Sequence, residues 1–208
     1  MELISTEESV VVFGGKGMVG SAILRLLSAR GYSRVFSPSR KDLNLLDNNA
    51  VKKWFQEFKP NVVILAAAKV GGILANNEYP ADFILENLKI QNNVIENSWR
   101  TNVQKFLFLG SSCIYPKYAT QPIKEEELLN GYLEPTNQWY AIAKIAGLKL
   151  CEALNRQYKF NSICLMPTNL YGPGDNYHTK NSHVLPALIK KFYKAKLNNE
   201  EEVICWGT

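Results

Sequence analysis

The sequence has 208 residues, of which 46% are hydrophobic and 21% are charged, proportions that are typical of a soluble globular protein. Its 24 Lys and Arg residues against 19 Asp and Glu residues give a net charge of +5, too scattered for a nucleic-acid-binding protein. There is no apolar run of about 18 residues, no hydrophobic leader and no zinc-ligand spacing among the four cysteines and two histidines. We therefore expect a protein of the reducing cytoplasm, without membrane, nucleic-acid or metal partners.

Short apolar runs alternate with longer helical patterns along the first 170 residues. The runs lack strict polar alternation, which is typical of strands covered on both faces. Strands and helices are expected in turn at 10–13, about 18–30, 34–36, about 48–58, 62–65, about 80–101, 105–109, about 137–158 and 162–165. This order predicts an α/β fold, a doubly wound parallel sheet of the Rossmann type with right-handed crossovers.

The remaining segment predicts a helix over 183–198 and a final strand over 202–206. A domain seldom ends directly after a strand, so we expect the protein to continue past Thr208. We divide the chain into a Rossmann-type domain over 1–170 and the incomplete beginning of a smaller substrate-binding part over 171–208. The long loop over 116–137 is expected to be functional because compact domains rarely contain such loops without a role.

A glycine-rich turn follows the first strand and opens the first helix. Gly14, Gly17 and Gly20 permit a tight turn, close approach of the backbone to a pyrophosphate, and close packing of the helix. The amides at the helix start, including those of Met18 and Val19, are candidate phosphate donors. We interpret the segment as a dinucleotide-binding turn; the alternative is a turn without a ligand.

The end of the second strand indicates which dinucleotide binds. Enzymes that use NAD usually place an acidic residue there to bind the ribose, whereas this chain has Arg40. Arg40 and Lys16 can together bind a 2′-phosphate, so the sequence favours NADP(H) over NAD(H). The alternative is that both are solvated surface charges. Asp47 is expected to cap the helix at 48–58, and contact with the adenine amino group is its alternative role.

Tyr140 and Lys144 lie four residues apart in a helical segment and therefore share a face. A nearby ammonium favours the phenolate, so we expect a lowered pKa of Tyr140 that allows proton transfer near neutral pH. Ser111 follows the fourth strand, at the sheet edge where ligands of open α/β sheets bind, and can hydrogen-bond a substrate carbonyl. Turn formation is the alternative role of Ser111.

These residues resemble the extended short-chain dehydrogenase/reductase family, and four further stretches are similar to the GDP-L-fucose synthases within it. The stretches are LAAAKVGG at 65–72, GSSCIYP at 110–116, MPTNLYGP at 166–173 and NSHVLP at 181–186. The similarity runs from about residue 9 to the end of the chain. It implies an NADPH-dependent homodimer that converts GDP-4-keto-6-deoxy-D-mannose to GDP-L-fucose by 3,5-epimerisation and then 4-keto reduction.

The resemblance also implies roles for single residues. Cys113 and His183 match the pair that moves protons at positions 3 and 5. Tyr140 would protonate the 4-oxygen, Ser111 would hydrogen-bond it, and Lys144 would hold the nicotinamide ribose. From the residues alone, Cys113 is also consistent with a buried apolar role and His183 with a helix start. Implied cofactor contacts include Gly14, Lys16, Gly17, Met18, Val19, Gly20, Arg40, Ala67, Lys144, Pro167, Asn169, Leu170 and His183, and implied substrate contacts are Asn169, Lys191 and Trp206.

Two alternatives stay open. The first is another extended short-chain sugar-nucleotide enzyme, an NAD-dependent 4-epimerase or dehydratase, against which Arg40, Cys113 and His183 argue. The second is a truncated, non-catalytic NADP-binding module. Lysines stand at 190 and 191 where family members often carry arginine, so a diphosphate contact there is unresolved. The other cysteines, at 151, 164 and 205, are expected in the core.

Overall fold

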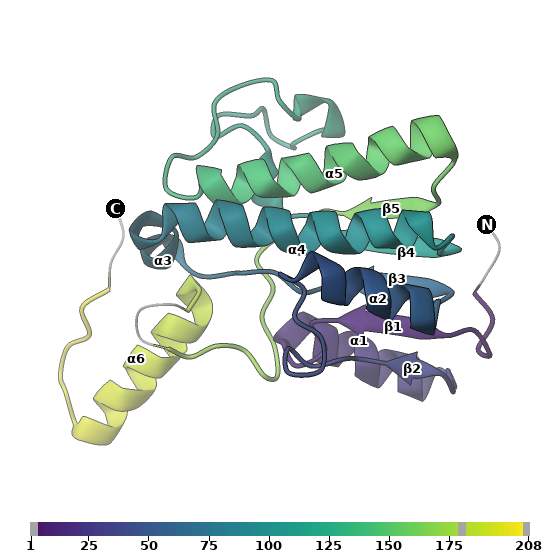
Figure 1. Ribbon diagram of the computed structural model, residues 1–208. Helices are drawn as coiled ribbons and strands as arrows, with labels where there is room; N and C mark the ends of the chain where they lie inside the picture. Colours follow the sequence, from purple (N-terminus) through teal and green to yellow (C-terminus); the bar gives the residue numbers. More distant parts are fainter. Residues whose placement is uncertain (1–3, 179–181, 206–208) are drawn as a thin grey trace.

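The computed structural model describes residues 4–178 and 182–205, which form a parallel five-stranded sheet (Figure 1). The strand order is β2-β1-β3-β4-β5, and every neighbouring pair is parallel. The strands are β1 Val10–Phe13, β2 Val35–Phe36, β3 Val62–Leu65, β4 Lys105–Leu109 and β5 Ser162–Leu165. The predicted doubly wound α/β fold is confirmed.

The principal helices also lie where the sequence predicted them. They are α1 Met18–Ala29, α2 Asn48–Phe58, α4 Pro80–Arg100, α5 Gln138–Tyr158 and α6 Val184–Asn198. Asp47 caps α2 as predicted, because its side chain accepts a hydrogen bond from the Ala50 amide at 3.0 Å. Three short helices were not predicted: α3 Ile73–Glu78, η1 Ser112–Ile114 and η2 Glu125–Glu127.

Two layers of helices cover the sheet unequally. In Figure 1, α2, α4 and α5 lie in front of the sheet and α1 lies behind it. The front layer buries the main core, which includes Phe55 of α2 and Phe106 and Phe108 of β4. On the back, α1 packs over Val10, Val12 and Val62. Leu165 of β5 is 46% exposed, so the expectation that the strands are covered on both faces is wrong at this residue.

The predicted strand over 202–206 is also wrong for the part that the structure describes. Residues 202–205 are irregular, and no neighbouring strand supplies the ladder hydrogen bonds that a strand needs. Cys205 is consequently exposed rather than in the core, whereas Cys151 is buried as expected. Trp206 lies outside the described residues. No helix in the described ranges is both long and apolar enough to cross a membrane.

Candidate active site

A cleft of about 880 Å³ lies at the carboxyl ends of the strands, where open α/β sheets bind ligands. It spans the point between β1 and β3 where the chain direction across the sheet reverses. Segments that follow all five strands line it, at 14–20, 38–40, 66–71, 110–111 and 167–170. The topology therefore gathers motifs that are far apart in the sequence.

The glycine turn has the close backbone contacts that the sequence predicted. Gly14 has φ +90°, and a Cβ on it would lie 2.7 Å from the Ala67 amide nitrogen. A Cβ on Gly20 would collide with the Gly14 carbonyl, to which Gly17 donates a 2.9 Å hydrogen bond. The first turn of α1 carries no acidic residue, so its free amides present an uncompensated positive end to the cleft.

Basic residues flank one end of the cleft. Lys16 and Arg40 both line it and are exposed. The hydroxyl and amide of Ser39 hydrogen-bond the Asp42 carboxylate and lower its pKa, with a smaller contribution from the charge of Lys16. Asp42 is thus engaged with the turn, and the structure brings both predicted cations to the same wall.

Lys144 lies beneath Tyr140 and does not hydrogen-bond its hydroxyl. The lysine is 4% exposed, donates to the Leu109 carbonyl at 2.8 Å, and sits 5.6 Å from the centre of the Tyr140 ring. Burial lowers the pKa of Lys144 to about 8. Burial also raises the pKa of Tyr140, with a smaller contribution from the charge of Cys113.

The predicted lowering of the Tyr140 pKa is therefore wrong. Desolvation of the phenol outweighs the ammonium, which is itself desolvated and partly neutral near pH 8. Tyr140 lines the cleft and keeps its proton at neutral pH. A protonated tyrosine suits a group that donates a proton.

Ser111 and Cys113 lie at the turn that follows β4. The Ser111 hydroxyl accepts a 3.4 Å hydrogen bond from the Cys113 amide. Ser111 lines the cleft, whereas the half-buried Cys113 is not among the described residues that line it. Burial raises the pKa of the Cys113 thiol, partly offset by the Ser111 hydroxyl and the charge of Lys144. The thiol is therefore protonated at neutral pH.

The remaining predicted residues divide into those at the cleft and those elsewhere. His183 lies at the N-terminal end of α6 and lines the cleft, as do Ala67, Pro167, Asn169 and Leu170. Lys191 is not among the described residues that line the cleft, and its Nζ donates to the Ile204 carbonyl at 3.1 Å.

One wall of the cleft was not anticipated from the sequence. It comprises Lys69, Asn76, Phe83 and Glu86, which come from the loop after β3, α3 and the start of α4. Lys69 lies within a motif that the sequence analysis singled out, but its partners Asp82 and Glu86 are 13 and 17 residues away. Only their i, i+4 spacing on α4 was a visible signal.

Comparison with known proteins places this cleft in a family. Residues 10–208 match the family model described as "NAD dependent epimerase/dehydratase family". The chain belongs to this family. Within the epimerase/dehydratase family, it is 55% identical over 203 residues to GDP-L-fucose synthase of Escherichia coli strain K12, covering 98% of this chain and 63% of that protein. It is 56% identical over 199 residues to GDP-L-fucose synthase 1 of Arabidopsis thaliana, covering 96% and 62%.

Solved structures of epimerase/dehydratase relatives have the same fold. A GDP-L-fucose synthetase from Naegleria fowleri bound to NADP superimposes with a TM-score of 0.88 at 30% identity, covering 100% of this chain and 68% of that one. A GDP-6-OMe-4-keto-L-xylo-heptose reductase from C. jejuni gives a TM-score of 0.91 at 44% identity, covering 96% and 57%. The present chain spans less than two thirds of the length of the curated relatives named above.

Proposed function

We propose that this chain carries the catalytic site of a GDP-L-fucose synthase. In this reaction GDP-4-keto-6-deoxy-D-mannose is epimerised at positions 3 and 5, and its 4-keto group is then reduced with NADPH. The supporting observation is that Ser111, Tyr140 and His183 line one cleft together with the glycine turn, with Lys144 directly beneath Tyr140. The relatives that carry the name GDP-L-fucose synthase match 95% or more of the chain.

The cleft fits NADP(H). The close contacts at Gly14 and Gly20 leave room for no side chain, as in dinucleotide-binding turns, and the α1 amides offer hydrogen-bond donors for a diphosphate. Lys16 and Arg40 supply two cations for a 2′-phosphate. When bound, NADPH supplies the hydride that reduces carbon 4.

The reduction also requires a proton. Tyr140 holds its proton at neutral pH and transfers it to the 4-oxygen as the carbonyl becomes a hydroxyl. Ser111 donates a hydrogen bond to the same oxygen. The buried Lys144 ammonium lies close enough to stabilise the phenolate that remains until solvent returns the proton.

Epimerisation requires two further groups because each carbon loses a proton on one face and gains one on the other. The 4-keto group makes the protons at carbons 3 and 5 acidic. We assign the two transfers to His183 as base and to Cys113 as acid, whose thiol is kept protonated by burial. The two residues come from different segments, the turn after β4 and the start of α6, and so can approach the sugar from different sides.

The same proposal covers the organisation of the chain. Residues 1–170 would form the NADP-binding domain, and residues 171–208 the beginning of the substrate-binding part, with Asn169, Lys191 and Trp206 as substrate contacts. A cytoplasmic location agrees with the free thiols of the described cysteines. A homodimer would cover Leu85, Trp139 and Ile142, which α4 and α5 expose; sedimentation velocity tests this.

The function is tested by mixing the protein with GDP-4-keto-6-deoxy-D-mannose and NADPH and following NADPH oxidation. We expect oxidation and a GDP-L-fucose product, and a roughly 10²–10⁴-fold loss of rate in Tyr140→Phe, the usual contribution of a positioned acid. The control is Tyr158→Phe, at the far end of α5. A protein that binds NADPH but never oxidises it would instead be a binding module.

A further inference from the structure

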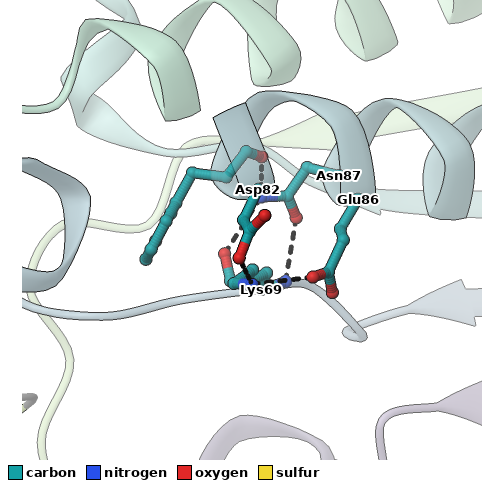
Figure 2. Close-up of polar contacts among 5 residues, drawn as sticks. Lys69, Asp82, Glu86 and Asn87 are labelled. Carbon is teal, nitrogen blue, oxygen red and sulfur yellow. Dashed lines mark hydrogen bonds and ion pairs between the residues drawn. The ribbon is translucent and has the colours of Figure 1, made fainter. Parts of the chain in front are cut away.

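The wall formed by Lys69, Asn76, Phe83 and Glu86 carries polar groups to which the proposed reaction gives no role. Figure 2 shows Asp82 and Glu86 extending from α4 toward Lys69 on the loop after β3. The Lys69 Nζ lies 2.7 Å from Glu86 Oε1 and 3.0 Å from Asp82 Oδ2. The charges of Lys69 and Glu86 cancel within the wall, and Asp82, which does not line the cleft, also pairs with Lys69, so this lysine is not a free cation for a diphosphate.

Lys69 is held in place at both its main chain and its side chain. Asn87 accepts from the Lys69 amide at 2.9 Å and donates to the Lys69 carbonyl at 3.0 Å (Figure 2). The hydrogen bond to Glu86 raises the pKa of Lys69, which therefore remains charged. With both carboxylates paired to it, Lys69 acts as a fixed support that orients Glu86.

Glu86 presents its carboxylate to the cleft. Its side chain is 29% exposed and lines the cleft, whereas Asp82 does not. Glu86 follows Phe83 by three residues on α4, and the Phe83 ring packs edge-on against Tyr140 with centres 6.5 Å apart. Phe83 thus lies between this turn of α4 and the group that donates the proton, and the Glu86 carboxylate can only accept hydrogen bonds.

Asn76 supplies a second acceptor in the same wall. The residue is 4% exposed, and its Nδ2 donates to the carbonyls of Gly71 and Gly72 at 2.9 and 3.1 Å. Its Oδ1 has no hydrogen-bond partner in the part of the chain that the structure describes. A buried acceptor without a donor is costly, and such atoms are normally satisfied by a ligand or water.

We propose that Glu86 and Asn76 form an acceptor subsite that binds hydroxyl groups of the sugar ring beside the reacting carbon. This inference rests on the proposed function. Two acceptors on a wall whose only cation is already paired with carboxylates suit uncharged hydroxyl donors, and the sugar hydroxyls must lie near Tyr140 in the proposed reaction. Ribose hydroxyls of the cofactor have the same chemistry, so the test includes an arm for each ligand.

The experiment measures dissociation constants for GDP-L-fucose, GDP and NADPH by calorimetry in the wild type and in Glu86→Leu. We expect Glu86→Leu to raise the dissociation constant for GDP-L-fucose about tenfold or more, the effect of losing a hydrogen bond to a charged group. The dissociation constants for GDP and NADPH should not change. Glu86→Gln, which keeps one acceptor oxygen, should lose less of the affinity for GDP-L-fucose. The matched control is Glu96→Leu, on the same helix and paired with Arg100 away from the cleft.

The outcomes separate this inference from the function on which it rests. If the wild type binds GDP-L-fucose no better than GDP, the protein does not recognise the sugar and both proposals fail. If the wild type prefers GDP-L-fucose and Glu86→Leu keeps that preference, only the subsite is overturned. If Glu86→Leu weakens the binding of NADPH but not that of GDP-L-fucose, the acceptors bind the cofactor, and the sugar subsite is likewise overturned. Circular dichroism establishes that Glu86→Leu is folded.

Discussion

Replacing Lys144 with methionine tests how strongly the buried ammonium opposes folding. Burial lowers the pKa of Lys144 from its ordinary value of 10.5 to about 8. Because one pKa unit corresponds to about 1.4 kcal/mol, the charged lysine destabilises the folded protein by roughly 3 kcal/mol. Lys144→Met removes this cost but also the hydrogen bond to the Leu109 carbonyl, which contributes about 1.5–3 kcal/mol. At pH 7 the variant should therefore be at least as stable as the wild type.

The pH dependence isolates the electrostatic part of this effect. Between pH 8 and 10.5 the unfolded wild type binds more protons at Lys144 than the folded one, so wild-type stability rises with pH across this window. The methionine variant lacks that rise. Its stability relative to the wild type should fall by roughly 2 kcal/mol from pH 7 to pH 9.5.

Urea denaturation at several pH values measures both free energies of unfolding. Lys149 is on the same helix, but its side chain is 45% exposed. The free energy of unfolding of Lys149→Met should therefore differ from that of the wild type by an amount that hardly varies with pH. Because Cys113 lies close enough to influence Lys144, the comparison should be repeated in a Cys113→Ser background. The reasoning would be refuted if the free energies of unfolding of Lys144→Met and the wild type differed by the same amount from pH 7 to 9.5.

Three further substitutions test other parts of the account. Arg40→Ala should lower the preference for NADPH over NADH about tenfold or more, measured as a ratio of dissociation constants, and an unchanged ratio would remove its 2′-phosphate role. Gly20→Ala should destabilise the fold by about 1–3 kcal/mol and weaken NADPH binding, because its Cβ meets the Gly14 carbonyl; unaltered thermal melting would contradict this. Asp47→Ala should cost about 0.5–2 kcal/mol of stability through the lost α2 cap, whereas Asp47→Asn should restore most of it.

Most of the sheet was predictable because its strands are short apolar runs between long amphipathic helices. The glycine turn, the Asp47 cap and the gathering of Ser111 and Tyr140 at one sheet edge all follow from the sequence order. What failed was the final strand, because strand formation depends on a partner that local sequence does not reveal.

The pKa shifts in the site were less predictable than the identity of the residues that form it. Sequence spacing places Lys144 beside Tyr140 but says nothing of how deeply each is buried, and burial decides both pKa directions. The wall of Asn76 and Glu86 was missed for a related reason. Asn76 lies in a six-residue helix without a clear signal, and Lys69 meets Glu86 only through the fold.

The central claim is that separate groups, at the cleft and beside it, serve epimerisation and reduction. Its most direct test is to incubate Cys113→Ser and His183→Asn with GDP-4-keto-6-deoxy-D-mannose and NADPH in deuterated water, and to measure by mass spectrometry the deuterium gained at carbons 3 and 5. The account predicts that each variant loses deuterium incorporation at one or both carbons while hydride transfer from NADPH continues. Normal incorporation with lost hydride transfer would contradict it and assign both residues to the reduction.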